Sequence, residues 1–159
     1  ENFVCGEDVE LSLRLQKAGA TSRFIAEAHV FHKRRATLKQ FRRQVFRFGA
    51  ARPLLAKAHP GNLKVTHLFP LVFTLYRHLT AIFAVVGIFY LHNSVFALPF
   101  ALYVVYMVGV FLTALRQEGL SVALLSVQTT NTMNEGYGIG FLRNFIEVYL
   151  KGNPKGIKL

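Results

Sequence analysis

The sequence predicts the end of an α/β domain followed by an α-helical transmembrane region. Three observations support this fold class. Residues 1–65 alternate between helical and strand-like patterns, the 21 residues Val95–Leu115 carry no charge, and charge is unevenly distributed along the chain. Residues 28–117 contain no Asp or Glu, whereas residues 33–57 contain nine Lys or Arg. The chain has 159 residues, is 52% hydrophobic and carries a net charge of +11. Its hydrophobic and basic residues are too unevenly distributed for one soluble domain.

The first part of the chain is predicted to form helix, strand and helix. Acidic residues in a first turn, followed by regularly placed apolar residues, predict a helix over Asp8–Ala18. Loose alternation of apolar and polar residues predicts a short strand over Thr21–Val30. A second helix is expected over Thr37–Ala56, with its first residue as N-cap and Pro53 as the point where it bends or ends. The turn at His59–Asn62 marks the boundary of this part.

Two membrane-crossing helices are predicted next. At about 1.5 Å per residue, Val95–Leu115 is long enough to cross a hydrocarbon core. The preceding crossing must include Arg77 and extend over roughly Leu68–Leu91 to reach the same length. His92–Ser94 then forms a tight turn between the two crossings. The excess of Lys and Arg before this hairpin predicts that the basic part lies on the cytoplasmic side.

The last part of the sequence is harder to assign to membrane or solvent. Leu120–Val127 is apolar, but Gln128–Thr132 is too polar for a lipid-facing crossing. Tyr137–Leu150 has one apolar side and one polar side, which favours an interfacial or re-entrant helix. The basic tail is expected in the cytoplasm, which favours an even number of membrane crossings. We therefore expect two crossings, with three as the alternative.

These patterns divide the chain into four parts. They are the end of a catalytic domain, a linker, a transmembrane hairpin, and a re-entrant or interfacial segment with a basic tail, at residues 1–58, 59–67, 68–116 and 117–159. The chain opens on Glu1 without Met or a targeting segment, so we expect it to be a fragment of a longer protein.

Several short motifs, in a fixed order, point to one family. Gly6-Glu7-Asp8 precedes a helix, Val30-Phe31-His32 follows the predicted strand, Gln44-Val45-Phe46-Arg47-Phe48 lies in the second helix, and Gly136–Phe141 is rich in glycine. In this order, and together with the membrane hairpin, they resemble the C-terminal part of a membrane-bound family 2 glycosyltransferase. The resemblance covers essentially the whole chain. It implies a GT-A, Rossmann-like catalytic domain that inverts configuration at the transferred sugar.

The resemblance also implies roles for single residues. Asp8, beside Glu7, matches the catalytic base that takes the proton of the acceptor hydroxyl. His32 matches a ligand of a divalent cation, Mg²⁺ or Mn²⁺, or a contact to the diphosphate of the donor. Other residues could contact the donor diphosphate or the acceptor; they are Arg34, Arg35, Gln44, Arg47, Phe48 and Arg77.

Each of these assignments has a simpler alternative. Acidic residues in a first turn commonly serve only to stabilise the helix. Most of the arginines could lie against lipid head groups, and His32 could be structural. Arg77 could extend to the interface or bind the phosphate of a lipid acceptor, and these two readings are about equally favoured. The family's processive members carry Trp where Phe48 stands, which favours transfer of a single sugar here.

The sequence therefore predicts a membrane-anchored inverting glycosyltransferase. It would move a sugar from a nucleotide-sugar donor to a lipid-linked or glycan acceptor at the cytoplasmic face of a bacterial inner membrane. The donor-binding half, with its D-x-D motif, is expected upstream of Glu1, so the chain alone should be inactive. The alternatives are a non-enzymatic module that binds anionic lipid or a partner, and a subunit that shapes a channel. A nucleic-acid partner is not expected.

Overall fold

The computed structural model describes residues 6–31 and 37–153. All regular secondary structure in this part of the chain is helical. It contains five α-helices, α1 (Glu7–Lys17), α2 (Leu38–Ala58), α3 (Phe69–Phe89), α4 (Leu98–Glu118) and α5 (Leu120–Phe145). Short 3₁₀ turns at Val65–His67 and Ser94–Ala97 precede α3 and α4, and a π-helical turn at Ile146–Leu150 extends α5.

The prediction of an α/β remnant is wrong for the described residues, because none of them forms a strand. The segment predicted as a strand, Thr21–Val30, is an irregular connection, and Phe24 within it is 90% exposed. A strand is stable only when its backbone groups pair with a neighbouring strand. No such neighbour exists in the described part of the chain, so the alternating pattern at Thr21–Val30 does not produce a strand.

The two helices of the first part are close to their predicted limits. The Thr37 hydroxyl caps α2 by accepting a hydrogen bond from the Gln40 backbone nitrogen at 3.3 Å, which confirms the predicted N-cap. The helix does not end at Pro53 but continues to Ala58. Pro53 is fully buried beside Leu54 and Leu55, and this packing offsets the backbone hydrogen bond that proline cannot make.

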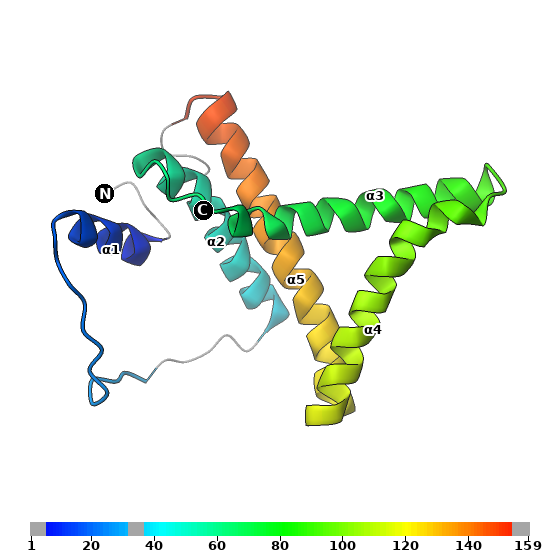
Figure 1. The fold of residues 1–159 in the computed structure, drawn as a ribbon, viewed down its shortest axis with the longest axis horizontal. Coiled ribbons are helices and arrows are strands. Elements are labelled where there is room, and N and C mark those ends of the chain that lie inside the picture. Colours follow the sequence, from blue (N-terminus) through cyan, green and yellow to red (C-terminus); the bar gives the residue numbers. More distant parts are fainter. Residues whose placement is uncertain (1–5, 32–36, 154–159) are drawn as a thin grey trace.

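The two predicted crossings correspond to α3 and α4. Phe69–Phe89 and Ser94–Glu118 are both long and apolar enough to cross a membrane. The turn between them is stabilised by the Asn93 side chain, which accepts a hydrogen bond from the Val95 nitrogen at 3.0 Å. Figure 1 shows that α3 and α4 diverge from this turn and that α5 runs from the end of α4 back across the start of α3. The three helices form a triangle, and α2 lies along the second half of α5.

The closest packing in the structure is between α2 and α5, which run parallel (Figure 1). Glycines on both helices allow their backbones to touch. A Cβ atom at Gly49 would lie 2.8 Å from the Tyr137 carbonyl carbon, and one at Gly140 would lie 2.9 Å from the Phe46 carbonyl carbon. The buried Asn144 amide donates to the Ala50 carbonyl at the same contact. Small residues at such positions are what allow helices to approach this closely.

α5 is a single helix that includes the polar stretch Gln128–Thr132. The polar side chains bond to carbonyls of their own helix: Thr129 to Leu125, Asn131 to Val127, and Asn134 to Thr130, at 2.8, 3.0 and 2.9 Å. These bonds satisfy polar groups that would otherwise be costly in apolar surroundings. The stretch is therefore compatible with an unbroken helix.

Candidate functional site

The predicted catalytic carboxylate lies in the first turn of α1. Gly6 precedes this helix in the left-handed region, with φ of 84°, and Glu7, Asp8 and Glu10 follow. Asp8 is exposed, and its Oδ1 accepts a hydrogen bond from the Val9 backbone nitrogen at 2.9 Å. An exposed carboxylate at this place is open to an incoming hydroxyl group.

α1 is attached to α2 at two points. At its start, a Cβ atom on Gly6 would lie 3.2 Å from the Ala51 side chain. Further along, the Glu10 carboxylate lies 3.4 Å from Nε2 of His59, and the Lys17 ammonium lies 3.1 Å from Nδ1 of the same ring. His59 is buried at the end of α2. From the sequence, His59 is expected only in a turn, and no local pattern relates it to Glu10.

Helix periodicity places part of the predicted site beside the start of α1. Gln44, Phe48, Ala51 and Leu55 follow one another at intervals of four, three and four residues, so they form one row along α2. Gly6 contacts this row at Ala51 and Leu55. The structure therefore brings Gln44 and Phe48 to the side of α2 on which α1 begins. Arg47 is half-buried at the edge of the same side.

Arg77 lies apart from this group, in contact with α5. Its guanidinium donates to the Glu135 carboxylate and to the Asn131 side-chain oxygen, both at 2.9 Å. It also lies 2.9 Å from Nε2 of His78. The Arg77 side chain is 17% exposed, so it is largely enclosed by these partners. Glu135 is on α5, outside the two candidate crossings, and the hydrogen bond from Arg77 holds its pKa below the ordinary value, against a smaller opposing effect of burial.

Two further contacts extend this arrangement to four helices. Glu135 also pairs with Arg42 on α2 at 3.4 Å, and the Tyr103 hydroxyl on α4 donates to the Asn131 side-chain oxygen at 2.8 Å. We call Arg42, Arg77, Tyr103, Asn131 and Glu135 the polar cluster. Glu135 and Asn131 were not predicted from the sequence as partners of Arg77. The available signal was that an arginine within an apolar helix usually pairs with a polar group on another one.

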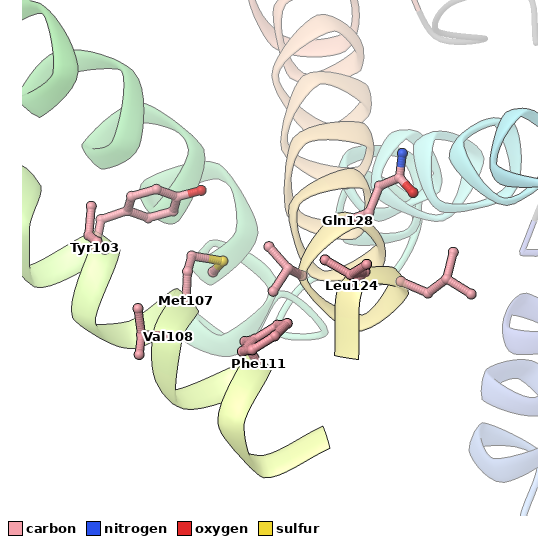
Figure 2. Close-up of a pocket in the computed structure, with 9 residues that line it drawn as sticks. Tyr103, Met107, Val108, Phe111, Leu124 and Gln128 are labelled. Atoms are coloured by element: carbon pink, nitrogen blue, oxygen red, sulfur yellow. The ribbon is translucent and has the colours of Figure 1, made fainter. Parts of the chain in front are cut away.

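An apolar groove lies next to the polar cluster, between α4 and α5 (Figure 2). Its volume is about 610 Å³, and side chains such as Met107, Phe111 and Leu124 line it. Tyr103 and Gln128 contribute the polar groups of its lining. Asn131 contacts Met107 as well as Tyr103, so the groove and the cluster are continuous.

The remaining predicted site residues, His32, Arg34 and Arg35, lie outside the described residues. Within residues 6–31 and 37–153, no group of three or more His, Cys, Asp or Glu side chains could hold a metal ion.

Comparisons with known proteins give one match. A family model described as glycosyl transferase family group 2 matches residues 1–127, which include α1 to α4 and the start of α5. No curated protein and no solved structure matches the chain.

Proposed function

Because this chain belongs to glycosyl transferase family group 2, we propose that it carries the acceptor side of a membrane-anchored inverting glycosyltransferase. The donor is a nucleotide sugar, and the acceptor is a lipid-linked molecule or a glycan at the cytoplasmic face of a bacterial inner membrane. The family match is the observation that carries this proposal. The exposed Asp8 supports it, because its helix begins on the side of α2 that presents Gln44 and Phe48.

In this proposal Asp8 acts as the general base. The acceptor hydroxyl attacks the anomeric carbon of the donor sugar while the carboxylate takes its proton, and the bond from that carbon to the diphosphate oxygen breaks. A new glycosidic bond forms, and the nucleoside diphosphate leaves with the bonding electrons. Glu7 precedes Asp8 in the same turn and adds negative charge there. The exposure of Asp8 allows a bulky acceptor to approach it.

The leaving diphosphate needs positive charge around it. Arg47, at the edge of the Gln44–Phe48 side of α2, is the described residue that we assign to this role, because a guanidinium can bind phosphate oxygens in pairs. Arg34 and Arg35 are proposed for the same role from the sequence. A Mg²⁺ or Mn²⁺ ion would supply further charge, with His32 as a ligand, and the described residues do not complete its site.

We further propose that α3 and α4 anchor the enzyme in the membrane, with the basic residues of α2 on the cytoplasmic side. The acceptor would then approach from the membrane side, where the groove between α4 and α5 lies. Its apolar walls suit a hydrocarbon chain, whereas the Gln128 amide and Tyr103 hydroxyl suit the hydroxyl groups of a sugar. Arg77 is a weaker candidate for binding an acceptor phosphate, since its donors already face Glu135 and Asn131.

The competing function is a non-enzymatic module that binds anionic lipid. The exposed arginines Arg42 and Arg43 on α2 favour it, because juxtamembrane cations attract such lipids. This function makes no use of the Asp8 carboxylate, which provides the discriminating test.

The test measures nucleoside diphosphate release by the full-length protein in membranes, with a panel of nucleotide sugars and with or without Mn²⁺ or Mg²⁺. Asp8→Asn is compared with Glu27→Gln, which removes another exposed carboxylate from the same part of the chain. Release that depends on metal, is lost in Asp8→Asn and is kept in Glu27→Gln supports the proposal. Release that survives Asp8→Asn removes Asp8 as the base. Folded protein that releases nothing from any donor supports the lipid-binding module.

A further inference from the structure

We infer that Glu135 is a positioning residue: its carboxylate links the first half of α2, which carries the Gln44–Phe48 element, to the membrane helices through Arg42 and Arg77. The link itself follows from the geometry of the polar cluster. Its consequence for sugar transfer rests on the proposed function.

The two oxygens of the Glu135 carboxylate serve two different helices. Oε2 pairs with Arg77 of α3 at 2.9 Å, and Oε1 pairs with Arg42 of α2 at 3.4 Å. The Arg42 side chain is 60% exposed and that of Arg77 is 17% exposed, so the pair with Arg77 is the better shielded of the two. Glu135 is thus held firmly by α3 and fixes α2 through Arg42.

α4 is joined to the same point through Asn131, one turn before Glu135 on α5. The Asn131 side-chain oxygen accepts hydrogen bonds from both Arg77 and Tyr103, at 2.9 and 2.8 Å. Arg77 of α3 therefore connects to Glu135 directly, and α4 is joined to it through Asn131. All four helices meet at one set of hydrogen-bonded side chains.

The second half of α2 is attached to α5 by direct contacts that do not involve Glu135. Gly49 and Ala50 contact α5 directly, and the Lys57 ammonium donates to the Val148 carbonyl at 3.2 Å. Before Gly49, Phe46 contacts Gly140, Val45 and Arg42 contact Gly136, and Arg42 forms the ion pair with Glu135. Loss of the carboxylate charge should therefore release mainly residues 38–46.

This release would reach the proposed site because Gln44 is only two residues after Arg42. Two residues correspond to about 200° around an α-helix, so the two side chains lie on opposite sides of α2. Any shift of α2 at Arg42 moves Gln44 relative to Asp8. A misplacement of about 1 Å in a catalytic arrangement can lower the rate by about 100-fold.

The experiment compares three substitutions in the full-length protein in membranes. Glu135→Gln removes the charge, Glu135→Asp keeps it, and Arg42→Gln breaks only the pair with α2, at a side chain that is 60% exposed. Glu147→Gln is the matched control, because it breaks the exposed pair between Glu147 and Lys151 just beyond α5. The readouts are kcat, the KM for the donor, and hydrogen exchange of the α2 amides.

We expect Glu135→Gln and Arg42→Gln to lower kcat by about 10- to 100-fold and to leave the donor KM unchanged. Amides of residues 38–46 should exchange faster in both variants, whereas amides of residues 50–58 should not. Glu135→Asp should recover part of kcat, and Glu147→Gln should match the wild type.

Unchanged exchange at residues 38–46 in both variants would overturn the link. Faster exchange with an unchanged kcat would overturn the positioning role, and so would equal loss of folded protein in Glu135→Gln and Glu135→Asp with Arg42→Gln fully active. If the wild type releases no nucleoside diphosphate from any donor, the proposed function fails. The exchange comparison then decides the link on its own.

Discussion

Replacing Gly140 by alanine directly tests how α2 and α5 pack. A Cβ atom at this position would press on the Phe46 carbonyl, 2.9 Å from its carbon, and would lie 3.2 Å from the Ala50 nitrogen. Ordinary contacts begin at 3.4 Å, so the carbon contact alone is short by 3.4 − 2.9, or about 0.5 Å. Both atoms belong to the α2 backbone, which cannot rotate away as a side chain can. The helices must therefore separate.

The cost of this separation can be isolated with a second glycine. Overpacking of a well-packed contact costs about 1–3 kcal/mol. This cost is partly offset, because replacing a helical glycine by alanine stabilises the helix by about 0.5–1 kcal/mol. Gly109→Ala on α4 provides that gain alone, because no atom lies within 4 Å of its added Cβ. The difference in unfolding free energy between the two variants is therefore the packing cost, about 1–3 kcal/mol.

The assay is thermal unfolding of both variants in the same detergent, followed by circular dichroism of the helices. For a chain of this size, 1 kcal/mol corresponds to about 2–4 °C, so Gly140→Ala should unfold about 2–12 °C below Gly109→Ala. The Asn144 bond to the Ala50 carbonyl lies at the same contact and should weaken with it. Equal midpoints for the two variants would refute the close approach of α2 and α5.

Other predictions concern single side chains and the cation. Thr37→Ala should lower the free energy of unfolding by about 1 kcal/mol through loss of the α2 N-cap, measured by denaturant titration, and no loss would contradict the cap. Arg77→Leu should lower the thermal midpoint more than Arg42→Gln, because Arg77 is the less exposed partner of Glu135; the reverse order would contradict the arrangement of the cluster. Burial, with Arg52 and Lys64 nearby, lowers the pKa of His67, so its neutral form stabilises the fold above the ordinary value of 6.5, and that stability is lost as pH falls through the lower folded value. Between pH 7.5 and 5.5 the midpoint of the wild type should therefore fall more than that of His67→Asn, which does not titrate, and parallel curves would refute this. A chelator should abolish nucleoside diphosphate release by the full-length protein and added Mn²⁺ should restore it, whereas full release in the chelator would exclude the proposed cation.

The features predicted well from the sequence depend on neighbouring residues along the chain. The N-cap at Thr37 and the two apolar helices are local in this sense, since a hydroxyl and the helical turn that donates to it, or a long apolar run, are visible in one stretch. The strand at Thr21–Val30 was wrong because a strand depends on a distant partner that alternation does not report. For Gln128–Thr132 the sequence shows polar side chains but not their partners, which lie on the same helix and on Arg77.

The candidate site shows the same division between local and distant information. Its residues could be named from motifs, but their grouping could not, because it depends on which side of α2 meets which helix. Gln44 and Phe48 share a side with the start of α1, whereas Arg42 and Gly49 lie on the side that α5 covers. Among the described helices, α2 contacts both the start of α1, where the proposed base lies, and the polar cluster. A displacement of the polar cluster is therefore expected to reach the start of α1 through α2.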